Sequence, residues 1–325
     1  MSKIINYILA NQWAVSLDVL RNGIGLIERH AAGIRATGDE VAAVIAHRER
    51  IRGMDDEGGA ERRLSMQEVS RPWDGALLVQ NEEDQQRGYY VNSGIAIVPM
   101  EGVFSRYASL VNGASSPRGT SMQAMVNSLK SAGNNGNVKA IVLEIDSPGG
   151  TVAGTEEVAA LVASGGGSGK PVVAWAAYLM CSAAYWIGSQ AEAIVANETA
   201  LVGNIGVYTV LEDTSVQAAA EGRKVHVVKA GAHKAIGVDG APVTESQLAV
   251  VQDEITGVYR TFVRHAARGR GMSESAMMDL ADGRAHSGQA AVLLNLADQV
   301  GTLTDAVALA AAMADGQRPR RKSGG

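Results

Sequence analysis

The sequence predicts an α/β protein built around a mostly parallel β-sheet. Short, strongly apolar segments alternate along the chain with longer segments whose apolar residues recur at helical spacing. Strands that alternate with helices favour right-handed βαβ units, in which successive strands run parallel. Apolar residues make up 46% of the 325-residue chain, so the sequence can form a sizeable core around such a sheet.

The predicted elements follow one another from about residue 94. We expect strands over residues 94–102, 138–146, 171–177, 193–196, 202–211 and 224–229. We expect helices over residues 119–132, 153–164 and 214–222, and another that begins at Ser182. From Thr244 to Ala314 the pattern is almost entirely helical.

Changes in composition divide the chain into four parts. We expect a helical segment over residues 1–34, a charged and partly flexible arm over 35–88, the main α/β domain over 89–314, and a disordered basic tail over 315–325. The chain has no run of about 18 apolar residues, and its first residues lack a convincing cleavage site. We therefore expect neither a stable membrane anchor nor a signal peptide.

The charged residues, cysteine and histidines argue against several function classes. The chain has 29 basic and 34 acidic residues, which give a formal net charge of −5 and no indication of a basic nucleic-acid-binding surface. Its single cysteine, Cys181, cannot form an internal disulfide. The six histidines show neither the spacing of metal ligands nor that of a catalytic triad. We expect no metal and no cofactor.

The first candidate for chemistry is the turn Asp146–Gly150, with the sequence DSPGG. An apolar strand runs directly into this turn, and a predicted helix follows it. Glycines allow backbone N–H groups to turn toward a ligand, and N–H groups near a helix start can stabilise an oxyanion. An ordinary tight turn between strand and helix explains the same residues equally well.

Ser182 lies at a second junction between a predicted strand and a predicted helix, in the sequence MCSAAYW. Such a turn can present a nucleophile at the end of a sheet, with the next backbone N–H aimed at a developing oxyanion. Ser182 and the N–H of Ala183 would take these roles. On the local sequence alone, a helix N-cap is the better interpretation of Ser182. Cys181 is a rival nucleophile, although a lone cysteine among apolar neighbours is more often a small buried side chain.

Several motifs in the same order resemble the signal peptide peptidase A (protease IV) family of serine peptidases. The resemblance covers about residues 90–312 and is carried by a strand that ends at Gly102 and by the sequences DSPGG (146–150), SAAYWI (182–187), AIVAN (193–197), LVGNIGV (201–207), KAIG (234–237), PVTE (242–245), ADGR (281–284) and ADQVG (297–301).

The resemblance implies the Clp protease/crotonase superhelix of ββα units, here with a helical N-terminal extension and C-terminal helices. It also implies a serine–lysine dyad, with Ser182 as the nucleophile and Lys234 as the general base. The implied oxyanion donors are Gly149, Gly150 and Ala183. A lysine acts as a base only when neutral, and burial in an apolar site lowers the pKa of its ammonium group.

Two positions depart from the pattern of the cellular family members. Asn204 stands where the family often has a serine, so a helper hydroxyl near the lysine is in doubt. Ala183 and Ala184 stand where the cellular enzymes often have glycines. The second departure is closer to the capsid assembly (head maturation) proteases of tailed phages within the same family.

The phage branch implies a prohead protease that processes scaffold, portal or capsid chains in the host cytoplasm or the prohead interior. The alternatives are a soluble signal-peptide-degrading peptidase and a structural component of the prohead core with weak catalysis. A crotonase-type acyl-CoA enzyme is disfavoured by the matched serine and lysine. The family resemblance also implies a homo-oligomeric ring, in which Ser182 and Lys234 meet across a subunit interface.

Overall fold

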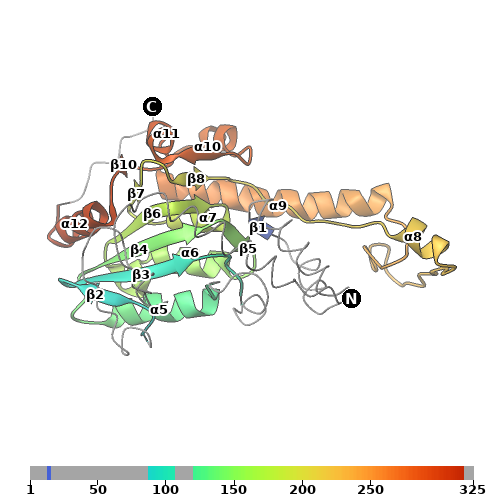
Figure 1. The fold of residues 1–325 in the computed structure, drawn as a ribbon, viewed down its shortest axis with the longest axis horizontal. Coiled ribbons are helices and arrows are strands. Elements are labelled where there is room, and N and C mark those ends of the chain that lie inside the picture. The colour runs from blue at the N-terminus through green and yellow to red at the C-terminus, as the bar shows by residue number, and fades with distance from the viewer. Residues whose placement is uncertain (1–12, 16–86, 107–119, 318–325) are drawn as a thin grey trace, which may run out of the picture.

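A computed structural model of the protein describes residues 13–15, 87–106 and 120–317. Figure 1 shows a body built around a β-sheet, and a slender part that extends away from the body and carries the short helix α8 (Ser215–Ala220) at its far end. The long helix α9 (Glu245–Arg270) runs back from this part to the body. We call residues 207–244, which precede α9, the projection.

Within the described residues the main sheet has eight strands, six of them in the continuous order β10–β7–β6–β4–β3–β2. These are β2 (Tyr90–Asn92), β3 (Ile95–Glu101), β4 (Ala140–Ser147), β6 (Val172–Cys181), β7 (Ala193–Ala196) and β10 (Gln299–Val300). All neighbours in this order pair parallel except β2 and β3, which pair antiparallel. The end of β6 pairs with β8 (Leu201–Gly203), and β8 pairs with β9 (Ala285–Ser287).

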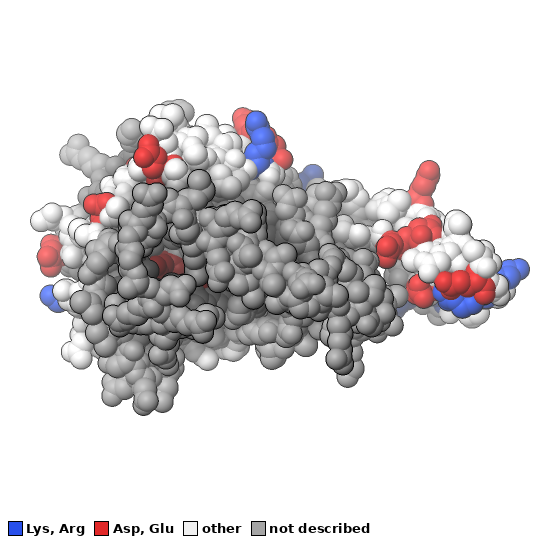
Figure 2. Space-filling model, viewed as in Figure 1, with Lys and Arg blue, Asp and Glu red and all other residues white. Residues whose placement is uncertain are grey.

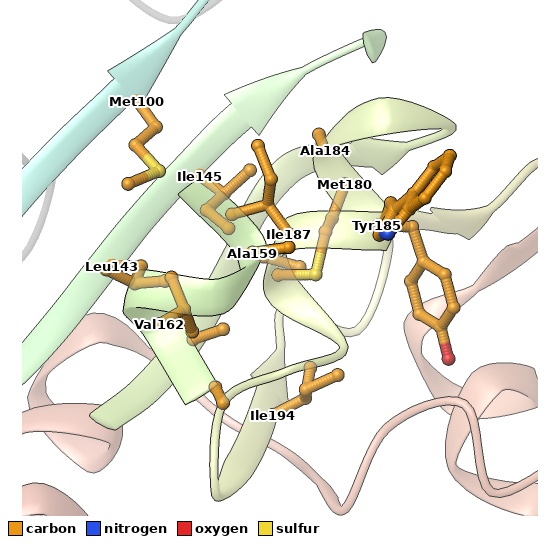
Figure 3. Packing of buried hydrophobic residues seen from close by; sticks show 14 of the residues in the cluster. Met100, Leu143, Ile145, Ala159, Val162, Met180, Ala184, Tyr185, Ile187 and Ile194 are labelled. Atoms are coloured by element: carbon orange, nitrogen blue, oxygen red, sulfur yellow. The ribbon is translucent and has the colours of Figure 1, made fainter. Parts of the chain in front are cut away.

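Helices cover both faces of this sheet, because alternate strand residues point to opposite sides. On one face, Leu143 and Ile145 of β4 join the core formed with α5 (Met122–Asn134), α6 (Thr155–Ala163) and α7 (Ala183–Gly188). Figure 3 shows part of this cluster.

On the other face, α12 (Leu303–Ala314) packs against the sheet. Its Leu303, Ala306 and Ala310 form a second cluster with residues such as Ile97 and Val142. This parallel sheet between helices confirms the predicted α/β class, and the β4–β5–α6 stretch, with β5 at Gly149–Thr151, has the order of one ββα unit.

The helix α9 begins directly after Thr244, where the helical region was predicted to start, and both of its ends carry local capping signals. Thr244 and Gln247 form a reciprocal capping box at its start, and Gly271 ends it with a left-handed backbone conformation, φ 65°. The buried residues of α9 all lie in its last third, from Phe262 to Arg270. The body therefore holds the C-terminal end of α9, while its N-terminal end accompanies the projection (Figure 1).

Most predicted elements are present, and several differ. The stretch predicted as a strand over 224–229 has no regular structure, and of the strand predicted over 202–211 only β8 forms. The C-terminal region is divided by β9 and β10 into α9, α10 (Glu274–Leu280), α11 (Gly288–Leu293) and α12.

The predicted helical segment over 1–34 differs at Trp13–Val15, which form the strand β1. The rest of that segment lies outside the described residues, as do nearly all of the arm 35–88 and the tail beyond Gln317. Of the helices that the structure describes, none is long and apolar enough to cross a membrane.

An ion pair between the buried Arg270 and the partly exposed Asp298 ties the end of α9 to the far edge of the sheet. The Arg270 guanidinium donates to both carboxylate oxygens of Asp298, at 2.8 and 3.0 Å, and to the carbonyl of Asn295 at 2.9 Å. Asp298 also accepts the backbone N–H of Ile194, the second residue of β7, at 2.7 Å. The side chain of Arg270 is only 3% exposed, so its charge depends on Asp298 for compensation.

Removing this carboxylate is expected to destabilise the protein strongly. The Asp298→Ala chain keeps a buried guanidinium without its anion, which costs about 3–5 kcal/mol of unfolding free energy. Urea unfolding followed by circular dichroism measures the loss. The matched control is Asp279→Ala, which removes an exposed aspartate of α10 and should change stability by no more than about 0.5 kcal/mol. Equal midpoints for the two variants would contradict the role given to the ion pair.

Candidate active site

Ser182 lies in the sharp turn between β6 and α7, with φ 55° and ψ −121°. Residues other than glycine rarely adopt this backbone conformation, and such strained turns cluster at functional sites. Two backbone hydrogen bonds hold it: Ser182 N–H donates to Gly203 O at 2.8 Å, and Trp186 N–H donates to Ser182 O at 2.9 Å. Ser182 occupies the N-cap position, but its side chain makes no capping hydrogen bond, so the simple cap interpretation is wrong.

The end of β6 bends just before this turn. Ile145 of β4 pairs with Ala176, but Ser147 pairs with Met180, so β6 advances four residues while β4 advances two. Such a register shift bends the strand locally. Beyond it, Leu179–Cys181 pair with β8. The bend brings the end of β6, and Ser182 directly after it, alongside the turn that follows Ser147.

The neighbouring Cys181 is a poor candidate for the nucleophile. Its Sγ donates to the carbonyl of Leu201 at 3.4 Å, and burial raises the pKa of its thiol to about 12. The reactive form of cysteine is the thiolate, which this environment disfavours. Ser182 is also buried, 1% exposed, and its Oγ lies 3.5 Å from the carbonyl oxygen of Gly206.

The helix α7 is fixed against α9 by Trp186. Its indole stacks on Phe262 with ring centroids 4.7 Å apart, and its Nε1–H donates to Nδ1 of His265 at 3.0 Å. On the same helix, the Tyr185 hydroxyl donates to the carbonyl of Leu296 at 3.1 Å. These contacts hold the first residue of the helix, Ala183, in place behind Ser182.

The contact between Trp186 and His265 predicts a pH dependence of stability. Burial, with the nearby cation of Arg268, lowers the pKa of His265, so the folded state favours the neutral imidazole that accepts this hydrogen bond. The stabilisation is complete above the unfolded pKa of about 6.5 and is lost as the pH falls toward the lower folded pKa.

Melting temperatures between pH 7.5 and 5 measure this loss. The His265→Asn chain, which keeps an acceptor but does not titrate, should fall less steeply than the wild type. Replacement of the exposed His226 by asparagine should leave the slope unchanged. Identical slopes for wild type and His265→Asn would contradict the assignment.

The glycine turn predicted as an oxyanion site forms β5, and it lies beside α7. Gly149 has φ 111°, and its N–H donates to Oγ of Ser147 at 3.1 Å. On one edge of β5, Phe104 N–H donates to Gly149 O at 2.8 Å, and Thr151 N–H donates to Phe104 O at 2.9 Å. Because backbone groups alternate along a strand, the N–H and C=O of Gly150 face the opposite edge.

Gly150 is required by close approach of the backbone. A Cβ atom at this position would lie 1.9 Å from the carbonyl oxygen of Phe104, closer than any real contact. Of the predicted oxyanion donors, Gly149 has its N–H engaged inside the turn. The Gly150 N–H points to the edge of β5 opposite Phe104, and the Ala183 N–H lies directly after Ser182 in the chain.

Lys234 lies on the projection, not beside Ser182. Its side chain is exposed, and its backbone N–H donates to Gly231 O at 3.2 Å. Figure 1 shows α8 and the chain that follows it at the far end of the projection, away from β6 and α7. Between these two described residues the structure has no contact, so a single chain does not assemble the predicted dyad.

The far end of the projection carries charges of both signs, visible in Figure 2. Arg223 pairs there with Glu221 at 3.2 Å and with Asp239 at 3.9 Å. The projection and the adjoining start of α9 also expose large apolar side chains. These are Val210, Val216, Val227, Val228, Val238 and Leu248.

Two further residues near the site have roles that the sequence did not specify. The Asn204 side chain donates to Gly283 O, and its backbone N–H donates to Arg284 O at 2.8 Å, so Asn204 ties the turn after β8 to the strand β9. His286 lies on β9, opposite Val202, with its Nε2 buried and without a hydrogen-bond partner. Only the pairing of β8 with β9, a tertiary contact, brings His286 into this region.

Comparison with known proteins gives a consistent result. Residues 166–317 match the model of Peptidase family S49. A putative protease of Methanocaldococcus jannaschii is 34% identical over 182 residues, which cover 56% of this chain and 58% of the relative. The capsid assembly protease C of Escherichia phage lambda is 27% identical over 254 residues, which cover 76% of this chain and 56% of the relative. The chain thus spans little more than half the length of these relatives.

A solved structure of a mutant of the 1510-N membrane-bound stomatin-specific protease aligns with a TM-score of 0.44 and 10% identity. The alignment covers 72% of this chain and 95% of that one.

Proposed function

Because residues 166–317 match the model of Peptidase family S49, we propose that the chain is a serine endopeptidase with Ser182 as the nucleophile and Lys234 as the general base. The observation that carries the proposal is the strained backbone of Ser182 at the end of β6, directly before the buried helix α7. A strand-to-helix turn of this kind presents a hydroxyl at the sheet end together with the N–H of the following residue.

In the proposed reaction, the Ser182 Oγ attacks the carbonyl carbon of the scissile peptide bond while neutral Lys234 accepts the hydroxyl proton. The oxyanion that forms accepts hydrogen bonds from the N–H groups of Ala183 and Gly150. The C–N bond then breaks, and the lysine returns the proton to the leaving amine. Water hydrolyses the remaining ester and regenerates Ser182.

We place Lys234 in the active site of a neighbouring protomer. Its position on the projection, and the exposed apolar residues there, among them Val216 at 81% and Val228 at 97% exposed, support a homo-oligomer in which the projection packs on the next chain. Burial of the lysine in that interface disfavours its charged form, as a general base requires.

Labelling with a fluorophosphonate tests the nucleophile directly. The wild-type chain should become covalently labelled at Ser182, as shown by mass spectrometry of its peptides, and the Ser182→Ala chain should not. Cys181→Ala is the matched control, because it removes the adjacent rival nucleophile and should leave labelling intact. Equal labelling of Ser182→Ala and the wild type would rule out Ser182.

For the biological role we propose a prohead protease that processes scaffold, portal or capsid chains in the host cytoplasm or the prohead interior. The alignment with the phage lambda capsid assembly protease over 76% of this chain supports this role. Co-expression with candidate head proteins should produce shortened head proteins with the wild type and none with Ser182→Ala. Degradation of signal peptides without any processing of head proteins would instead indicate a signal-peptide-degrading peptidase. If the chain showed neither activity, it would be a structural component of the prohead core.

A further inference from the structure

The strand β1 (Trp13–Val15) lies along the edge of β5 that faces away from Phe104. The two strands pair antiparallel, with Trp13 opposite Thr151, Ala14 opposite Gly150 and Val15 opposite Gly149. Figure 1 shows β1 next to β5 at the side of the body. A segment far from β5 in sequence thus occupies an edge that belongs to the predicted oxyanion turn.

The register aligns the backbone of Ala14 with a proposed oxyanion donor. The other edge of β5 is already filled by Phe104, through the hydrogen bonds of Gly149 O and Thr151 N–H. Alternation therefore directs the N–H of Gly150 toward β1, where Ala14 lies directly opposite. An extended peptide that adds to an open strand edge uses its main chain in the same way, whatever its side chains.

Under the proposed function, the edge of β5 that pairs with β1 is a substrate site, because β5 lies next to the turn that holds Ser182. Ser147, which pairs with Met180 of β6, leads through Pro148 into β5, and α7 packs against β5. The Gly149–Thr151 edge thus runs alongside the turn that holds Ser182. A peptide carbonyl opposite Gly150 is the carbonyl whose developing oxyanion Gly150 would stabilise.

We propose that Trp13–Val15 is an intramolecular substrate-like strand, which occupies the substrate edge of β5 with the carbonyl of Ala14 in the place of a scissile carbonyl. The consequence of this inference is that β1 competes with the substrates of the chain, and this consequence rests on the proposed function. The pairing itself is a structural claim that does not depend on catalysis. Substrates must displace β1 before they bind.

Hydrogen exchange tests the pairing without using activity. In the Ser182→Ala chain, the amide of Gly150 should exchange slowly. The additional substitution Ala14→Pro removes the Ala14 N–H, so the pairing of β1 with β5 is weakened by about one ordinary hydrogen bond. The Gly150 amide should then exchange about fivefold faster or more. Val15→Pro should accelerate exchange less, because alternation turns the Val15 N–H away from β5. Equal exchange with and without Ala14→Pro would overturn the proposal.

Cleavage of fluorescently labelled casein tests the competition. In the active chain, Ala14→Pro should raise the rate at low casein concentration about fivefold, while fluorophosphonate labelling of Ser182 continues. If labelling and cleavage both occur but Ala14→Pro leaves the casein rate unchanged, the inference fails and the proposed function stands. If neither chain is labelled at all, the proposed function fails, and the exchange experiment still decides the pairing. A new N-terminus at Val15 in the wild type, absent from Ser182→Ala, would support the substrate-like position of Ala14.

Discussion

Neither the Ser182→Ala chain nor the Lys234→Ala chain should cleave casein, whereas an oligomer assembled from both variants together should recover activity. Removal of a catalytic nucleophile or base typically lowers the rate on the order of ten-thousandfold or more. If each active site takes its serine from one protomer and its lysine from the next, the two variants complement each other. A site works whenever an intact Ser182 meets the intact Lys234 of the partner chain.

Random assembly sets the size of the recovery. In an equimolar mixture, half of the serines and half of the lysines are intact, so about a quarter of the interfaces in a closed ring contain both. The two chains are best co-expressed with different tags and purified through both tags, so that only mixed oligomers are assayed. Casein cleavage per protomer is then compared with the wild type.

The control for Lys234 is Lys224→Ala, which removes another exposed lysine of the projection and should keep wild-type activity. A mixture that stays inactive while Lys224→Ala is active would contradict the shared site. If Lys234→Ala alone cleaves normally, Lys234 is not the base. In that event His286, with its buried and unpartnered Nε2 on β9, is the first described histidine to test.

Gly150→Ala should remove most of the activity as well. The added methyl group would sit 1.9 Å from the Phe104 carbonyl oxygen, so β5 must shift and the Gly150 N–H loses its direction. Misplacing one oxyanion donor lowers kcat by about 10²–10³-fold, and the overpacking costs about 1–3 kcal/mol of stability.

Casein cleavage and urea unfolding, measured on the same preparation, separate the two effects. Gly136→Ala is the matched control, because a Cβ at Gly136 would meet no atom within 4 Å. A folded Gly150→Ala chain with the activity of Gly136→Ala would show that Gly150 is neither tightly packed nor a donor.

The sequence predicted the elements whose signals are local. The apolar runs of β3, β4, β6 and β7 are local signals, and each strand begins close to its predicted start. The helix expected from Thr244 also begins directly after that residue. The strand expected over 224–229 did not form, because an alternating pattern shows that a segment suits a sheet but supplies no partner strand. Among the described residues, no strand lies beside 224–229.

The site was harder to predict because its geometry is set by distant contacts. Nothing beside Ser182 in the sequence distinguishes a helix cap from a strained nucleophile turn. The difference is made by Gly203, which accepts the Ser182 N–H, and by the register shift between β4 and β6. The family resemblance implied that Ser182 and Lys234 meet across a subunit interface, but the sequence did not predict the projection that carries Lys234 (Figure 1). The pairing of Trp13–Val15 with β5 joins segments more than a hundred residues apart, and no local pattern predicts it.

The separation of Lys234 from Ser182 has a consequence for when the enzyme works. Under the proposed mechanism a solitary chain holds a nucleophile without its base, so proteolysis begins only at concentrations where chains associate. Mass action then makes the onset steep, because the active species grows faster than in proportion to the total protein. Newly synthesised, dilute chains would leave surrounding proteins intact, and crowding many copies into a small compartment would start digestion. Under this mechanism the projection makes proteolytic activity depend on the local concentration of the chain.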